Sequence, residues 1–98
     1  MHRTATPILL FGLIWSGQAQ ANAFCLAINR VAIGGGLQSY SNEQVESSVC
    51  TATREAANAR ARQDRFGERA CLEATRYMIA EFTRRFPGRD PTTTVGRC

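Results

Sequence analysis

The chain has 98 residues, a formal charge of +4, twelve arginines, no lysine, one histidine and four cysteines. A chain of this length forms one domain with a thin apolar core, for which covalent cross-links are expected. The only histidine, His2, lies in a segment that we expect to be removed. A mature chain without histidine or lysine excludes Ser-His-Asp and Cys-His relays, Schiff bases and histidine-bound zinc. We therefore expect a protein that is not an enzyme and that has no cofactor and no metal site.

The pattern of residues 1–21 is that of a cleaved signal peptide. A basic start precedes an apolar run over residues 7–15, and small residues spaced two apart then allow cleavage after Ala21 or Ala23. The apolar run is too short for a membrane-spanning helix, which needs about 20 apolar residues. We therefore predict a periplasmic or secreted protein with a single mature domain over residues 22–98.

All four cysteines belong to the expected mature part, at Cys25, Cys50, Cys71 and Cys98. An even number of cysteines in an oxidising compartment predicts two disulfides. The wide spacing leaves no Cys-x-x-Cys, so neither a metal site nor a redox pair has a local signature. Each bridge should contribute about 2 to 4 kcal/mol to the stability of so small a domain.

The mature part begins with a short helix, expected over residues 24–33, because apolar residues predominate there and three glycines follow. Residues 37–40 are then a connection. Ser41 is the expected N-cap of a second helix, and Gln44 lies at the position that completes a capping box.

Two longer helices are expected next. In the first, apolar residues recur at spacings of three and four, at Val45, Val49, Ala52, Ala56 and Ala59. A shifted apolar stripe follows at Cys71, Ala74, Met78 and Phe82, with Leu72, Ile79 and Phe86 beside it. The shift predicts a break near residues 63–67 and a third helix that ends near Arg85. One bent helix remains the alternative, since an interior glycine costs only about 1 kcal/mol.

Pro87 and Gly88 end the helical pattern, and residues 89–98, with a further proline and three threonines, are expected to be extended. The predicted fold class is therefore all-α: a small disulfide-stapled domain with a short N-terminal helix, two longer helices and an extended C-terminal tail.

Helix lengths also suggest the disulfide pairing, at a rise of about 1.5 Å per residue. Cys25 and Cys50 lie equally far from the middle of the connection, so they would face each other in an antiparallel hairpin. Pairing Cys50 with Cys71 would need a turn ahead of the expected break. We therefore favour Cys25 with Cys50 and Cys71 with Cys98.

Arginine is the residue type that stands out, and clustered guanidinium groups bind phosphates, carboxylates and lipid head groups. Interleaved acids at a spacing of four, such as Glu81 with Arg85 and Arg69 with Glu73, would pair with some of them. A GC-rich genome, which favours arginine codons, is the preferred explanation of the missing lysine. The possible anion-binding residues are Arg62, Arg65, Arg69, Arg84 and Arg85.

These observations predict a non-enzymatic protein that binds another macromolecule. The expected partner is a protein in the cell envelope or outside the cell, and the role would be that of an inhibitor, an immunity factor or an accessory subunit. The sequence argues against nucleic acid as a partner, because no aromatic residues alternate with the arginines and the protein is expected to be exported. The alternative is a cationic membrane-active protein that binds anionic lipid. Its lipid-facing residues would be Leu72, Ile79, Phe82 and Phe86, beside the arginines that end the third helix.

Overall fold

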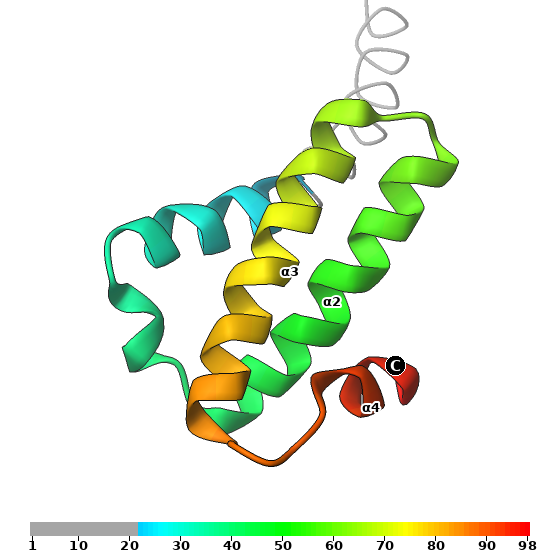
Figure 1. The fold of residues 1–98 in the computed structure, drawn as a ribbon. Coiled ribbons are helices and arrows are strands. Elements are labelled where there is room, and N and C mark those ends of the chain that lie inside the picture. Colours follow the sequence, from blue (N-terminus) through cyan, green and yellow to red (C-terminus); the bar gives the residue numbers. More distant parts are fainter. Residues whose placement is uncertain (1–21) are drawn as a thin grey trace, which may run out of the picture.

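A computed structural model describes residues 22–98, which form an all-α domain of three main helices and a short one (Figure 1). The first helix covers residues 22–33. It is followed by a 3₁₀ turn, η1 (Gly36–Ser39), and by the helices α2 (Asn42–Ala61), α3 (Arg65–Arg85) and α4 (Pro91–Gly96). The predicted fold class is confirmed, whereas the predicted signal peptide, residues 1–21, lies outside the described residues.

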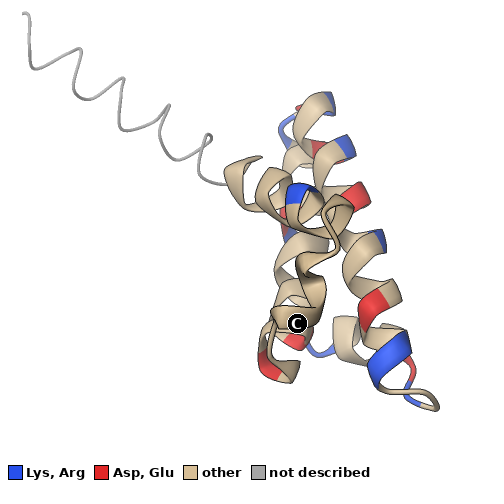
Figure 2. Ribbon diagram, turned by 90° about the vertical axis from the view of Figure 1, so that its left-hand side faces the viewer, with Lys and Arg blue, Asp and Glu red and all other residues tan. Residues whose placement is uncertain are grey.

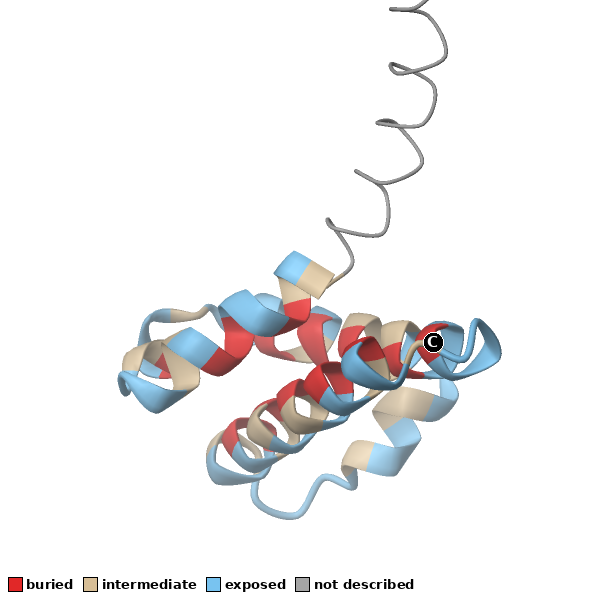
Figure 3. Ribbon diagram, turned by 90° about the horizontal axis from the view of Figure 1, so that it is seen from above, coloured by how far each residue is buried: buried red, intermediate tan, exposed pale blue. Residues whose placement is uncertain are grey.

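Helices α2 and α3 form an antiparallel hairpin whose facing sides make the core. All five residues of the α2 stripe are buried, as are Cys71, Ala74, Met78 and Phe82 of α3. Figure 3 shows these buried stripes turned toward the middle of the bundle. The two stripes are therefore confirmed, and the capping box of α2 is present with both of its hydrogen bonds, between Ser41 and Gln44.

The break between α2 and α3 lies at residues 62–64, so two helices, and not one bent helix, are present. Gln63 has a positive φ of 59°, and its amide donates to the Arg60 carbonyl at 3.0 Å. The next amide, of Asp64, donates to the Ala59 carbonyl at 2.9 Å. This is the Schellman arrangement that ends helices, with glutamine in the position that glycine usually occupies. The carboxylate of Asp64 then caps α3 by accepting from the Gly67 amide at 2.9 Å.

The first helix packs against α3, and the disulfide pairing predicted from helix lengths is wrong. The bridges join Cys25 to Cys71 and Cys50 to Cys98, with Cα–Cα distances of 5.0 and 5.5 Å. The arithmetic assumed that the first helix runs antiparallel beside α2, whereas the first helix lies against α3. Cys25 faces α3 and not α2, as does Asn29, whose Nδ2 donates to the Ala70 carbonyl at 3.0 Å.

All four cysteines are nevertheless bridged, as predicted. The two loops close over 46 and 48 residues, and each such closure is worth about 4 kcal/mol in the chain-entropy estimate. The loops overlap between Cys50 and Cys71, so the two contributions are not independent. Two disulfides indicate an oxidising, extracytoplasmic compartment.

The tail that was expected to be extended contains α4. The carboxylate of Asp90 accepts from the Thr92 amide at 2.9 Å, and Pro91 follows at the first helical position. Both features favour helix initiation. The Cys50–Cys98 bridge holds this helix against α2 (Figure 1). Within residues 22–98, no helix combines the length and the apolar character that crossing a membrane requires.

Candidate functional site

The five arginines predicted to bind anions fall into two groups at opposite ends of α3. Arg62 and Arg65 lie at the turn between α2 and α3, and Arg69 follows one helical turn later. Arg84 and Arg85 end the same helix, and Arg84 lies about 28 Å from Arg65 along the helix axis. Figure 2 shows basic residues at both ends of the bundle, with acidic residues between and beside them. The structure therefore offers no single surface that contains all five.

Arg85 is engaged in contacts within the fold. Its guanidinium donates to the carbonyls of Tyr40 and Leu37, at 2.6 and 2.9 Å, and to Oδ1 of Asn42 at 3.1 Å. Its Nε donates to the Glu81 carboxylate at 2.6 Å, so the predicted pair of Glu81 and Arg85 is present. Only 12% of the Arg85 side chain is exposed. The residue fastens the connection after the first helix to the end of α3.

Glu81 is the acid at the centre of this cluster, and it is buried. Hydrogen bonds from Arg84 and, more weakly, from Arg85 hold the pKa of the Glu81 carboxyl below its ordinary value, although burial acts in the opposite direction. The same contact raises the pKa of Arg84. Arg84 is the one member of this group whose side chain is largely exposed, at 58%.

The turn between α2 and α3 is different, because it combines arginines with an exposed aromatic ring. We call Arg62, Arg65, Phe66 and Arg69 the hairpin tip. Phe66 is 63% exposed, although it follows the apolar stripe of α2 in the sequence. Arg65 and Arg69 are exposed, and within residues 22–98 no carboxylate lies within 4.0 Å of either guanidinium. Arg62 makes only a long contact, 3.9 Å from Asp64.

The pairings expected to neutralise the tip do not form. Arg60 and Asp64, which also lie four residues apart, do not pair, because α2 ends between them and Asp64 caps α3. Glu73 accepts from the Tyr77 hydroxyl at 3.4 Å and lies beyond ion-pair distance of Arg69. The guanidinium groups of the tip therefore keep most of their charge available to another molecule.

A shallow groove continues from the tip along the seam between α2 and α3. Its volume is about 230 Å³, and Leu72, which is 48% exposed, lies on one wall. Arg60 and Glu68 lie at the end nearest the tip. The groove is lined by Thr53, Ala56, Ala57, Arg60, Glu68, Leu72 and Thr75.

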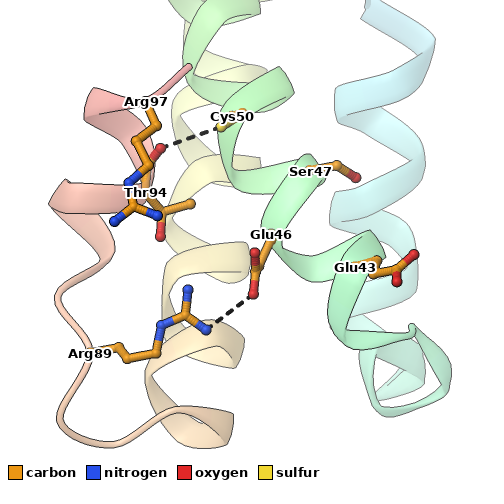
Figure 4. Close-up of a pocket in the computed structure, with 7 residues that line it drawn as sticks. All are labelled: Glu43, Glu46, Ser47, Cys50, Arg89, Thr94 and Arg97. Carbon is orange, nitrogen blue, oxygen red and sulfur yellow. Dashed lines mark hydrogen bonds and ion pairs between the residues drawn. The ribbon is translucent and has the colours of Figure 1, made fainter.

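A second hollow, of about 330 Å³, lies between the first half of α2 and α4 (Figure 4). Its lining contains Cys50 and four charged side chains, those of Glu43, Glu46, Arg89 and Arg97. Arg89 donates to Glu46 at 3.1 Å, and its guanidinium also stacks over the rings of Phe82 and Phe86. The charges of this hollow are thus partly neutralised within it.

Sequence reasoning missed two of these features. Phe66 continued the spacing of the buried stripe of α2, and only the exact position of the break decides that it is exposed. The second hollow depends on α4, which was expected to be extended. No group of three or more His, Cys, Asp or Glu that could hold a metal ion occurs among the residues that the structure describes.

Comparison of the chain with protein-family models, with curated proteins and with solved structures finds no match. The hairpin tip is therefore the feature whose chemistry points to a function.

Proposed function

We propose that this is an exported, non-enzymatic binding protein, periplasmic or secreted, whose hairpin tip docks on an acidic surface of another protein. The observation that carries the proposal is the exposed ring of Phe66 beside Arg65 and Arg69, neither of which has a carboxylate within 4.0 Å in the described part of the chain. Arginine and aromatic residues are enriched at the centres of protein interfaces, where they form most hot spots.

The rigidity of the tip supports the same role. The Schellman turn, the Asp64 cap and the Cys25–Cys71 bridge, which anchors the first turns of α3 to the first helix, hold its backbone. A preorganised surface loses little conformational entropy when it binds. Electrostatic attraction to an acidic partner would mainly raise the association rate, and it would weaken with added salt.

The alternative, a cationic membrane-active protein, would use apolar residues that the fold mostly employs elsewhere. Phe82 is fully buried, Ile79 and Phe86 pack against the core, and only Leu72 of the expected set is substantially exposed. A single exposed phenylalanine at the tip also offers little apolar area for insertion into lipid. Anionic lipid is therefore an outcome of the test below.

The test is site-specific photo-cross-linking in the envelope fraction of the source cells. A photoreactive phenylalanine analogue replaces Phe66, and in a control protein it replaces Thr93, which is exposed on α4. The charge-reversal variant Arg65→Glu/Arg69→Glu is compared with Arg30→Glu/Arg97→Glu. Both variants change the net charge equally, and the residues of the second are exposed far from the tip in sequence.

The proposal predicts one cross-linked protein at position 66 that is absent at position 93. Its yield should fall at least about tenfold for the tip variant or in high salt, since loss of a hot spot costs 2 kcal/mol or more, and it should be unchanged for the control variant. Mass spectrometry should identify a protein with an acidic surface. Equal loss in both variants would indicate non-specific attraction. Release of dye from phosphatidylglycerol vesicles, but not from neutral vesicles, would favour the membrane-active alternative.

A further inference from the structure

The two disulfides differ in their exposure to solvent. Cys25 and Cys71 are 0% and 1% exposed and belong to the core. Cys98 is exposed and Cys50 is half-buried, and Cys50 lines the hollow between α2 and α4. We propose that Cys50–Cys98 is a site of thiol–disulfide exchange whose substrate class is a dithiol, while Cys25–Cys71 stays closed. This inference is independent of the proposed binding at the hairpin tip.

Access decides which bridge an incoming thiolate reaches, because the attacking sulfur must approach one sulfur of the disulfide directly. At Cys50–Cys98 the hollow of about 330 Å³ provides that space, and Figure 4 shows Cys50 at its upper edge, beside Thr94 and Arg97. At Cys25–Cys71 the first helix and α3 exclude solvent from both residues. An attack there requires the first helix to separate from the bundle.

The charges around the exposed bridge favour an anionic thiolate. Arg89 and Arg97 both line the hollow, and within the described residues no carboxylate lies within 4.0 Å of Arg97. Glu46 is paired with Arg89, and Figure 4 shows Glu43 turned away from Cys50. A guanidinium without a close acid favours the approach of an anionic thiolate. Cys98 is exposed whereas Cys50 is half-buried, so Cys98 is the sulfur that is attacked and Cys50 is the leaving group.

The exchange transfers two electrons from the dithiol to the protein in two steps. One thiolate of the dithiol attacks Sγ of Cys98, a new S–S bond forms, and the Cys50–Cys98 bond breaks with its electron pair on Sγ of Cys50, which takes up a proton from water. The second thiolate of the dithiol then attacks the dithiol sulfur that is now bonded to Sγ of Cys98. The Cys98 thiolate leaves and is protonated, and the dithiol closes to a disulfide. The protein gains two electrons and two protons, and the dithiol is oxidised.

Helix α4 can separate from the bundle once this bridge opens. It has six residues, none of them buried, and among its hydrophobic side chains Val95 packs against the core. Further attachments lie in the preceding segment, where Arg89 contacts Glu46 and the two phenylalanine rings. Reduction should therefore free α4 and open the hollow, while α2, α3 and the first helix stay folded.

The experiment exposes the exported protein, with both bridges intact, to limiting dithiothreitol. Samples are quenched with iodoacetamide at intervals and mapped by mass spectrometry, while circular dichroism follows the helix content. A Cys50→Ser/Cys98→Ser variant, treated in the same way, shows how the core bridge reacts without its neighbour. Cleavage by trypsin after Arg89 reports the release of α4.

We expect alkylation of Cys50 and Cys98 at least about 100-fold faster than that of Cys25 and Cys71, because exposing a core element requires an infrequent opening. Helix content should stay nearly unchanged, and cleavage after Arg89 should accelerate only after the reaction. The core bridge should resist equally in the variant. The proposal is overturned if both bridges open together, if Cys25–Cys71 opens first, or if neither opens before the protein unfolds.

Discussion

The Arg85→Ala variant tests whether the arginine that ends α3 holds the fold together. The substitution removes a nearly buried guanidinium and leaves the carbonyl of Tyr40 without this donor, while the Leu37 carbonyl keeps only the Tyr40 amide. Breaking a buried ion pair costs about 3 to 5 kcal/mol. Because Arg84 still neutralises Glu81, we expect the lower end of that range, about 3 kcal/mol.

Urea unfolding at pH 7, followed by circular dichroism, measures this loss. In a domain of this size about 3 kcal/mol corresponds to a fall in Tm of about 12 to 24 °C. Arg84→Ala is the matched control: it removes the neighbouring arginine of the same cluster, whose side chain is mostly exposed, and should change the midpoint far less. Equal effects of the two substitutions would refute the structural role of Arg85.

Two further predictions concern the helix break and the buried acid. Gln63→Gly should raise the free energy of unfolding by up to about 1 kcal/mol. The left-handed conformation costs a residue other than glycine about 1 to 2 kcal/mol, and glycine gives back part of this gain because it loses more chain entropy on folding. A lower stability of the variant in urea would contradict the assignment of the turn. The lowered pKa of Glu81 means that the unfolded state binds its proton more readily. The stabilisation is therefore complete above the ordinary glutamate pKa of about 4.3 and is lost as the pH falls through the lower folded value. The urea midpoint of Glu81→Gln should consequently depend less on pH between about 4 and 2 than that of the unsubstituted protein, and equal slopes would show that Glu81 is not the acid responsible.

The two long helices were predictable because their signals are local. A stripe such as Val45, Val49 and Ala52 repeats with the period of the helix, and Ser41 with Gln44 forms a cap from residues three apart. Every group involved lies within one or two turns of its partner. Such features depend little on how the helices are placed relative to one another.

The disulfide pairing was not predictable in the same way, because it depends on which neighbour the first helix faces. The contacts that decide this join residues far apart in the sequence, such as Asn29 with Ala70 and Arg85 with Leu37. Helix α4, by contrast, had a local signal that was overlooked: Asp90 followed by Pro91 is a typical helix start.

The candidate site likewise combines features that local sequence signals predict with features that depend on distant contacts. Sequence patterning identified the arginines but could not tell which would be used within the fold: Arg85 is held by carbonyls of a distant connection, whereas Arg65 and Arg69 remain exposed. The exposure of Phe66 depends on a turn that begins with a left-handed glutamine, a conformation that no sequence rule assigns to that residue. Anion binding by any of these arginines stays a prediction.

Asn29 offers a sharp test of how the first helix packs. It is 7% exposed, its Nδ2 donates to the Ala70 carbonyl, and its Oδ1 is buried without a hydrogen-bond partner among the described residues. In an Asn29→Asp variant a charged carboxylate would face that carbonyl in a dry site. The carboxyl should therefore remain protonated in the folded state, where its hydroxyl can replace the amide as donor.

The pH dependence of this variant follows from the direction in which burial shifts the pKa of the new carboxyl. Burial raises the pKa of the new carboxyl above the unfolded value of about 3.9, so the unfolded state releases a proton at pH 7 and is favoured. The loss of stability at pH 7 cannot exceed the difference between pH 7 and the unfolded pKa, which is about 3 pH units or about 4 kcal/mol. This loss should vanish below about pH 4. Asn58→Asp, at an exposed position of α2, should show no such recovery. If Asn29→Asp were as stable as the unsubstituted protein at pH 7, water would reach this site and the first helix would not be sealed against α3.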